Sequence, residues 1–136
     1  MSDLIERAKT FYRLALTEPK RACDEFLAED FVLENRLPAH FPFGGVYRGA
    51  EGFLTYLGEL VEAIDMGPLQ IDAWVADGNE VVMRGTEAST VKNTGRRYAM
   101  SFVHWLSFDE NGRVTVMREF NDTATMACLL YTSPSP

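Results

Sequence analysis

The sequence contains few of the residues that build metal sites or disulfides, and no stretch long enough to cross a membrane. Only two cysteines, Cys23 and Cys128, and two histidines, His40 and His104, occur among its 136 residues. The cysteines lie far apart and in no CxxC pattern, which argues against a disulfide framework. No group of His, Cys and carboxylate residues has metal-ligand spacing, and no apolar run approaches the roughly 20 residues of a membrane span. We therefore expect no metal, no other cofactor and no membrane segment.

Positive charge is also scarce. The 13 lysines and arginines are outnumbered by 20 aspartates and glutamates, which gives a formal net charge of −7. Nucleic acids and anionic membrane surfaces attract basic proteins, so neither is an expected partner. The start of the chain, Met1–Glu6, lacks the basic residues and apolar block of a signal peptide, which favours a cytoplasmic location. Hydrophobic residues make up 46% of the chain, enough for the core of one domain.

Apolar spacing predicts helices first and strands afterwards. The helical period appears in three segments, which are 3–16, a shorter one that begins near Pro19, and 50–64. Strands are expected over 31–35, 69–77, 80–91, 97–108 and 113–121. This order is typical of an α+β domain.

The segments outside these elements differ in character. Residues 36–49 are rich in proline, glycine and aromatic residues and are expected to form a loop that covers the domain. We place the domain at residues 1–128. The Ser-Pro-rich end, residues 129–136, is expected to be disordered or not native to the domain.

The turn at Asn111-Gly112 sets the register of the last two strands. If it is a two-residue type I′ turn, His104 lies directly opposite Glu119 on an otherwise apolar surface. The same register pairs Phe102 with Asn121, Leu106 with Met117, and Phe108 with Thr115. A three-residue turn would slip the register and place Arg118 opposite His104 instead. The residues expected to line a pocket for a small apolar molecule on this face are Phe102, Met117 and Asn121.

The hairpin around Gly78 predicts which face of the preceding strand is buried. A two-residue turn there places the odd residues of 69–77 beside the even residues of 80–91. The face expected to be buried consists of Leu69, Ile71, Ala73 and Val75. Arg84 would then point inward, where it needs an anionic partner such as Glu119.

The opposite face of the sheet is also apolar. It carries Trp74, Val81, Met83, Val103, Trp105, Val114, Val116 and Phe120. A sheet that is apolar on both faces must be covered on both. We therefore expect a homodimer that forms through the outer face of the sheet.

A few polar residues are candidates for chemistry on the inner face. His104 and Glu119 form either an acid–base pair or a polar pair that fixes the register. Arg84 could hold an oxyanion or form a structural ion pair with Glu119. Asn35 could donate to a substrate carbonyl or end a strand through a backbone hydrogen bond. Tyr12 lies on the apolar stripe of the first helix, where a core position and a pocket position both fit.

Four segments carry a resemblance to known proteins. They are FLAEDFVLEN at 26–35, FGGVYRG at 43–49, FDENGRV at 108–114 and REFND at 118–122. In order and spacing they resemble the nuclear transport factor 2-like superfamily, and within it the SnoaL-like proteins. The resemblance covers roughly residues 3–128. It implies a cone, in which three helices pack on a strongly bent antiparallel sheet with a pocket inside.

Each branch of this superfamily implies different roles for the candidate residues. Ketosteroid isomerases carry a general-base aspartate at the position of Asn35 and an oxyanion-hole acid at that of His104. Limonene epoxide hydrolases are similar at Arg84 and Asn35, but Thr86 replaces one of their acids. SnoaL-type polyketide cyclases place a histidine and an acid inside the cone, which His104 and Glu119 match best.

The resemblance favours a cofactor-independent acid–base enzyme of the cyclase or isomerase type, acting on a small apolar carbonyl compound. His104 would exchange a proton with the carbon next to the carbonyl, and Glu119 would orient His104 or share the proton. Arg84 and Asn35 would stabilise the enolate oxygen. The alternatives are a non-catalytic small-molecule binding protein and an epoxide hydrolase with altered acids.

Overall fold

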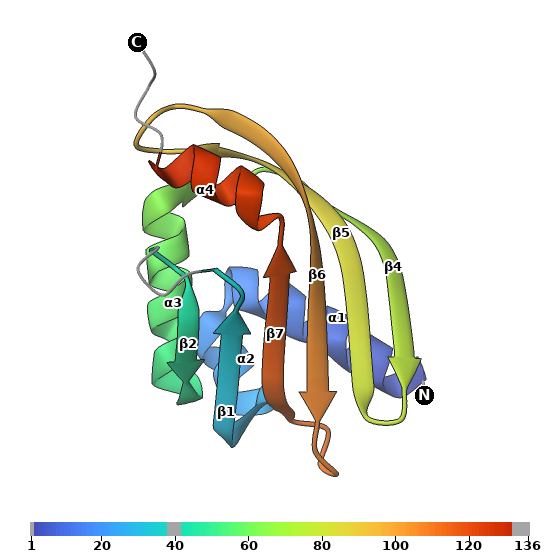
Figure 1. Ribbon diagram of the computed structural model, residues 1–136. Helices are drawn as coiled ribbons and strands as arrows, with labels where there is room; N and C mark the ends of the chain where they lie inside the picture. The colour runs from blue at the N-terminus through green and yellow to red at the C-terminus, as the bar shows by residue number, and fades with distance from the viewer. Residues whose placement is uncertain (1, 38–41, 132–136) are drawn as a thin grey trace.

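The structure is a computed structural model that describes residues 2–37 and 42–131. Within these residues the elements follow in the order α1 (Ser2–Thr17), α2 (Pro19–Phe26), β1 (Leu27–Asn35), β2 (Gly45–Arg48), α3 (Gly49–Ala63), β3 (Ile64–Asp65), β4 (Leu69–Asp77), β5 (Glu80–Val91), β6 (Arg97–Phe108), β7 (Val114–Asn121) and α4 (Thr123–Tyr131) (Figure 1). The predicted α+β order is confirmed, and the bounds of β4, β5 and β6 match those expected.

The first three helices form where the apolar spacing predicted them. α1 buries Phe11 and Leu14, which lie one turn apart on the same helix face. α2 begins with Pro19 in its first turn, where a missing backbone N–H has no cost. α3 buries Phe53 and Tyr56, again one turn apart. These helices lie together on one face of the sheet (Figure 1).

The strands form one curved sheet in the order β2-β1-β7-β6-β5-β3, and β4 also pairs with β5. All of the pairs are antiparallel except β1 with β7. β4 pairs with Glu80–Glu87 of β5, whereas β3 pairs with its last two residues. The long strands β5 and β6 bend over the helices at the end where β3 pairs with β5 (Figure 1). The concave face and the helices therefore enclose the core, as the resemblance implied.

The turn between β6 and β7 has three residues, 110–112, and not the predicted two. The Asp109 amide donates to the Arg113 carbonyl at 2.8 Å, and the Gly112 amide donates to the Asp109 carbonyl at 3.0 Å. Gly112 has a φ of +74°, which only glycine adopts easily. The Asp109 carboxylate also accepts the amides of Asn111 and Arg113. The aspartate thereby favours the longer turn.

A bulge restores the predicted register beyond this turn. Phe108 pairs with Val114, so its predicted pairing with Thr115 was wrong. The extra residue, Thr115, then shifts the pairing by one position. His104 consequently lies opposite Glu119, and the predicted pairs Phe102–Asn121 and Leu106–Met117 are present as well.

The β4–β5 hairpin has the predicted two-residue turn but buries the opposite face. Ala73 pairs with Arg84 as expected. Near the turn, Ala73 and Val75 nevertheless point outward, and Val75 is 60% exposed, whereas Leu69, beyond a bulge, lies opposite Glu87 on the inner face. The inward residues are Trp74, Ala76, Val81 and Met83. Arg84 is exposed, so the prediction that it points inward to Glu119 was wrong.

β5, and not β4, determines which face is buried. β5 pairs with β6 so that Met83 lies beside His104 and Val81 beside Leu106. The inner face of β6 therefore continues onto the odd residues of β5. β4 lies beside the first part of β5, and its outward residues stay uncovered by the helices. A second bulge, between Ile71 and Ala73, removes the remaining predicted pairs of this hairpin.

Three elements were not predicted, namely β2, β3 and α4. β1 also begins four residues before the expected strand. The Asp122 carboxylate accepts the Thr125 amide at 3.0 Å and caps α4. Met126 of α4 is 2% exposed and closes one end of the core. α4 includes residues 129–131 of the expected tail, and residues 132–136 lie outside the described part. None of the described helices is long and apolar enough to span a membrane.

Candidate acid–base site inside the cone

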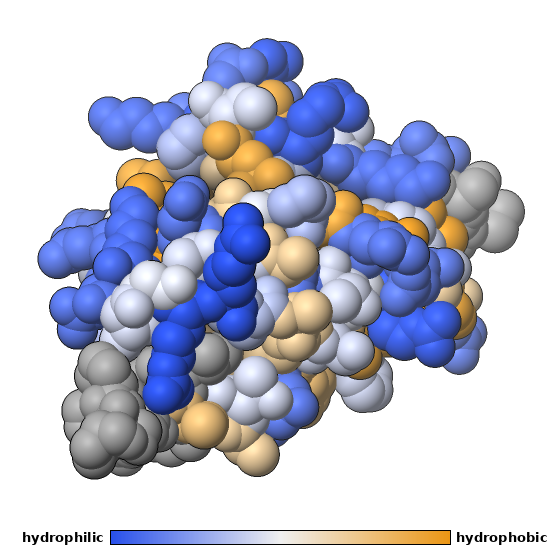
Figure 2. Space-filling model, turned by 90° about the horizontal axis from the view of Figure 1, so that it is seen from above, coloured by the Kyte–Doolittle hydropathy of each residue, from blue (hydrophilic) through white to orange (hydrophobic). Residues whose placement is uncertain are grey.

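A cavity of about 110 Å³ lies between the concave face of the sheet and helices α1 and α3. Its walls are aromatic rings and methionines, namely Phe11, Tyr12, Phe43, Phe53, Tyr56, Tyr98, Phe102, Met66, Met83, Met100, Met117 and Met126, with a few leucines. Leu16 and Leu69 line it and are 64% and 37% exposed, which marks where it reaches the surface. From above, hydrophobic residues are visible between charged side chains (Figure 2). A mostly apolar cavity with few polar groups is typical of a small-molecule site.

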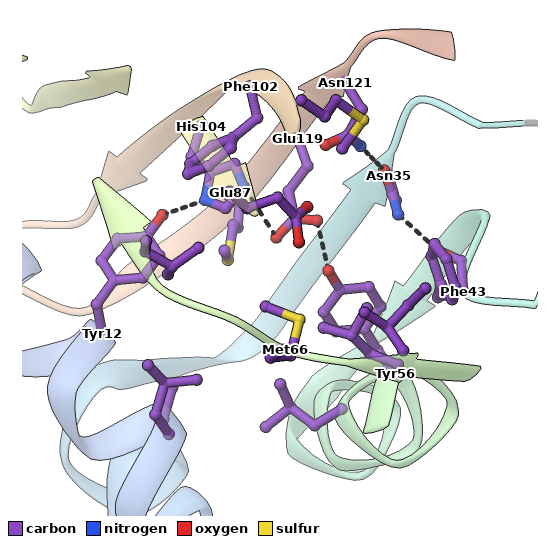
Figure 3. A pocket seen from close by; sticks show the side chains of 18 of the residues that line it. Tyr12, Asn35, Phe43, Tyr56, Met66, Glu87, Phe102, His104, Glu119 and Asn121 are labelled. Carbon is purple, nitrogen blue, oxygen red and sulfur yellow. Dashed lines mark hydrogen bonds and ion pairs between the residues drawn. The ribbon is translucent and has the colours of Figure 1, made fainter. Parts of the chain in front are cut away.

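His104 lies among the polar groups of this cavity (Figure 3). Its Nδ1 is 2.8 Å from the Tyr12 hydroxyl, and its Nε2 is 3.6 Å from Oε2 of Glu119. Burial raises the pKa of Tyr12 well above its ordinary value, so the hydroxyl keeps its proton. Burial also lowers the pKa of His104, and the charge of Glu119 opposes that effect. The imidazole is therefore neutral near pH 7.

The contacts of His104 determine which of its nitrogens carries the proton. When the Tyr12 hydroxyl donates to Nδ1, the imidazole proton lies on Nε2 and faces the Glu119 carboxylate. The other tautomer would set the Nε2 lone pair against a carboxylate oxygen, which is repulsive. The favoured tautomer thus presents an N–H group to Glu119.

The Glu119 carboxylate is enclosed, with the residue only 3% exposed. The Tyr56 hydroxyl donates to Oε1 at 2.6 Å, and His104 faces Oε2 (Figure 3). Burial and the charge of Glu119 raise the pKa of Tyr56, which remains a donor. Within the described part of the chain, the basic side chain near the Glu119 carboxylate is His104, and its lowered pKa keeps it neutral. Glu119 therefore lies beside hydrogen-bond donors but beside no fixed cation.

Asn35 and Asn121 form a second polar group at one end of the cavity. The Asn35 amide donates to the Phe43 carbonyl at 2.6 Å and its oxygen accepts from Asn121 at 2.8 Å. Asn35 is 4% exposed. These contacts join the ends of β1 and β7 to the segment before β2. Contacts within the protein thus occupy both the amide nitrogen and the oxygen of the Asn35 side chain.

Among the residues predicted for the site, only Arg84 lies away from the cavity. The others all line it, namely Tyr12, Asn35, Phe102, His104, Met117, Glu119 and Asn121. They come from α1, β1, β6 and β7, which the fold brings together. Arg84 lies on the outer face of β5, so it cannot contact a ligand held there.

Sequence reasoning missed Glu87 and Tyr56. Glu87 lines the cavity, and its Oε2 accepts from Ser89 at 2.9 Å and Tyr98 at 3.3 Å. Burial raises the pKa of Glu87, and the charge of Glu119 adds to this. The alternation of β5 could have located Glu87, since it lies on the same face as Met83. Tyr56 lies one helical turn after Phe53, but no pattern indicated that its hydroxyl meets an acid.

These groups are suited to moving a proton. A buried carboxylate, an imidazole N–H and a tyrosine O–H lie together in an apolar cavity, where electrostatic interactions are stronger than in water. Within the ranges 2–37 and 42–131, no group of three or more His, Cys, Asp or Glu side chains could hold a metal ion. The chemistry that the residues themselves supply is acid–base chemistry.

A cone of helices on a bent sheet, with polar groups enclosed at the inner face, is the nuclear transport factor 2-like fold. The chain belongs to the SnoaL-like domain family, whose sequence model matches residues 8–117. The fold that the sequence resemblance implied is therefore confirmed. A comparison with curated protein sequences found no match.

Solved structures have the same fold. An NTF2-like protein from Burkholderia xenovorans LB400 is 24% identical, with a TM-score of 0.85 and coverage of 96% of this chain and 97% of that one. An NTF2-like protein of unknown function from Burkholderia pseudomallei K96243 is also 24% identical, with a TM-score of 0.83 and coverage of 97% and 100%. A Mesorhizobium loti protein, provisionally assigned as a SnoaL-like polyketide cyclase, is 20% identical, with a TM-score of 0.70 and coverage of 85% and 97%. These identities show the fold alone.

Proposed function

We propose that the protein is a cofactor-independent acid–base enzyme that acts on a small apolar carbonyl compound, as an isomerase or a polyketide cyclase does. The observation that carries this proposal is the buried Glu119 carboxylate beside the N–H of His104 and the O–H of Tyr56. A base and two donors at one point of an apolar cavity are what enolate formation needs. The provisional assignment of a relative as a polyketide cyclase agrees with this reaction class.

The tautomer of His104 supports a specific division of roles. Glu119 accepts the proton from the carbon next to the carbonyl, and the electron pair of that C–H bond moves onto the carbonyl oxygen. His104 and Tyr56 then donate hydrogen bonds to this oxygen, and each such donor typically contributes about 10²–10³ in rate. Glu119 returns the proton to another carbon in an isomerisation. In a cyclisation, the enolate carbon instead attacks a second carbonyl carbon of the same substrate, whose C=O π bond breaks, and the resulting alkoxide takes the proton from Glu119.

This division differs from the roles expected from the sequence. Proton acceptance moves from His104 to Glu119, because the favoured tautomer has its proton on the nitrogen that faces the cavity acid. Arg84 has no part, since it lies on the outer face. Asn35 holds Phe43 and Asn121 in place, and we assign it a positioning role.

A non-catalytic binding protein is the second candidate. The observation that favours it is that every buried polar side-chain atom of the described residues already has a hydrogen-bond partner. The Tyr12–His104 and Tyr56–Glu119 contacts could then serve recognition alone. An epoxide hydrolase has less support, because the arginine expected to take part, Arg84, is outside the cavity.

The test is hydrogen–deuterium exchange next to the carbonyl of small apolar ketones in D₂O, followed by NMR. We expect exchange above background with the natural sequence and its loss with His104→Ala. Ketone binding, measured separately by titration, should weaken much less than exchange. Ketones that bind without exchanging would refute the enzyme proposal and favour the binding protein.

We also propose a homodimer through the outer face of the sheet. Two apolar side chains on this face, Trp105 and Val75, are 40% and 60% exposed. An exposed apolar sheet face is a common site of association. Sedimentation analysis over a range of protein concentrations tests the proposal, and a monomer at all concentrations would refute it.

A further inference from the structure

The charged groups that line the cavity are of one kind among the described residues. Two carboxyl side chains, Glu87 and Glu119, reach into it (Figure 3). No lysine or arginine occurs among the described residues that line it. The two groups are close enough for the charge of Glu119 to act on Glu87. The carboxyl groups of the cavity therefore have no lysine or arginine beside them, among the described lining residues, to balance a negative charge.

The aromatic walls act in the same direction. Seven phenylalanine and tyrosine rings line the cavity, together with the ring of His104. The centroid of the Phe102 ring lies 4.9 Å from that of His104, and the Tyr12 ring stacks on His104 at a centroid distance of 5.6 Å. The faces of aromatic rings carry partial negative charge and attract cations, and quaternary ammonium groups are often bound in this way.

The size of the cavity limits what can enter without rearrangement. An enclosed apolar cavity of about 150 Å³ in another protein holds one benzene molecule, and this one measures about 110 Å³. A compact head group of a few heavy atoms fits such a space. Five methionines line it, and their flexible side chains can move to admit a larger apolar body.

We propose that the cavity selects ligands that carry a compact cationic nitrogen, such as an alkylated ammonium group, and holds that nitrogen beside Glu87 and Glu119 among the aromatic rings. The inference rests on the proposed function in taking this cavity as the substrate site, and it narrows the substrate to an apolar carbonyl compound with a cationic nitrogen. An anionic ligand would meet two carboxyl groups without a counter-charge, so the same arrangement excludes it.

The test compares two probes of nearly equal shape, choline and its uncharged carbon isostere dimethylbutanol. Methyl signals of the methionines report binding directly, because Met83, Met100 and Met117 line the cavity. We expect choline to shift these signals and to bind about tenfold or more tightly than the isostere. Equal or tighter binding of the isostere, or no binding of choline, would overturn the inference.

Three variants locate the effect. Glu87→Gln and Glu119→Gln should each weaken choline binding about tenfold while leaving dimethylbutanol binding nearly unchanged. Glu110→Gln removes the same charge from an exposed turn and should change neither affinity. A response of choline binding to Glu110→Gln equal to that of the cavity variants would show a general charge effect and refute the site.

The exchange experiment keeps this inference separate from the proposed function. If apolar ketones exchange deuterium while choline fails to bind, the enzyme proposal holds and the cation site is wrong. If choline binds with the expected selectivity and cationic amino ketones bind without exchange, the cation site holds and the enzyme proposal fails.

Discussion

The two faces of the sheet carry similar acid and aromatic groups in opposite electrostatic settings. On the inner face, Glu119 is 3% exposed and takes its hydrogen bond from Tyr56, with no fixed cation beside it. On the outer face, Glu80 accepts from the Trp105 indole at 2.6 Å, and the Arg118 guanidinium lies 5.7 Å from the same ring. The outer group contains its own cation and meets water.

This difference separates the proposed site from the group on the outer face. Arg118 and Glu119 are neighbours on β7, and strand alternation sends them to opposite faces. A register slip of one residue would exchange the two side chains, with Arg118 inside and Glu119 outside. The bulge at Thr115 prevents that slip. The inner acid therefore has hydrogen-bond donors but no cation beside it, whereas the outer group of Glu80 and Trp105 includes the Arg118 guanidinium over the same ring.

The largest effect on ketone exchange should appear when two single variants are compared, one that removes the inner acid and one that removes the outer acid. Glu119→Gln keeps the shape of the side chain but cannot accept a proton, and we expect it to lower deuterium exchange of ketones by about 10²–10⁴. Glu80→Gln should leave the exchange rate within about twofold of the natural sequence, because it lies on the outer face. Equal losses in both variants would remove the functional distinction between the faces.

The next effect concerns space on the inner face. A Cβ atom added at Gly85 would lie 2.6 Å from the Gln70 carbonyl oxygen and 3.0 Å from Phe102. The contact with backbone cannot be relieved by a side-chain movement, so Gly85→Ala should destabilise the fold by about 1–3 kcal/mol. Urea denaturation measures the change as a shift in midpoint.

The control for this variant is Gly58→Ala, on the exposed side of α3. No heavy atom lies within 4 Å of an added Cβ there. Alanine in a helix interior should stabilise the protein by roughly 0.5–1 kcal/mol. Opposite signs are therefore expected for the same chemical change, and a stable Gly85→Ala protein would mean that the inner face has more room than the structure gives it.

A smaller effect should appear in the pH dependence of stability. Burial raises the pKa of Glu87 above its ordinary value of 4.5. Between that value and the raised pKa, the folded chain binds more protons than the unfolded chain, so the contribution of Glu87 to stability falls as pH rises through this window. Glu87→Gln should therefore be more stabilising relative to the natural sequence at the upper end of the window than below pH 4.5.

His104 makes a contribution of the opposite sign. Burial lowers its pKa from 6.5, so the unfolded chain binds the proton more readily and stability falls as pH drops below that value. Comparing Glu87→Gln with the natural sequence at each pH removes this background, since both proteins retain His104. A difference that does not vary with pH would show that Glu87 is not held as the structure indicates.

The sequence predicted the part of the site that local rules determine. Hairpin register and alternation placed His104 opposite Glu119, although the two-residue turn assumed at Asn111-Gly112 was wrong. Two deviations, the longer turn and the bulge at Thr115, cancelled at the position that matters. Bulges are not visible in a hydrophobic pattern, so this agreement could not have been verified without the structure.

The errors concern long-range geometry. The prediction that Arg84 points inward rests on the β4–β5 hairpin alone, and β4 has apolar residues on both faces. The faces of β5 and β6 are linked by pairing, with Met83 beside His104, and using this second hairpin would have turned Arg84 outward and Glu87 inward. Tyr56 could not be found in this way, because its contact with Glu119 depends on how α3 packs on the sheet.

The smallest effect on the fold should come from Trp105, on the outer face. Its ring is 40% exposed, so Trp105→Ala should cost a single subunit no more than about 1 kcal/mol through its contacts with Glu80 and Arg118. If the protein forms a homodimer through this face, the stability lost in Trp105→Ala depends on protein concentration, because subunit association adds stability that rises with concentration. We therefore expect the natural sequence to gain stability with concentration and Trp105→Ala to lose that gain. If the two proteins differ by the same small amount at every concentration, the outer face is a solvent-exposed surface and the homodimer proposal is wrong.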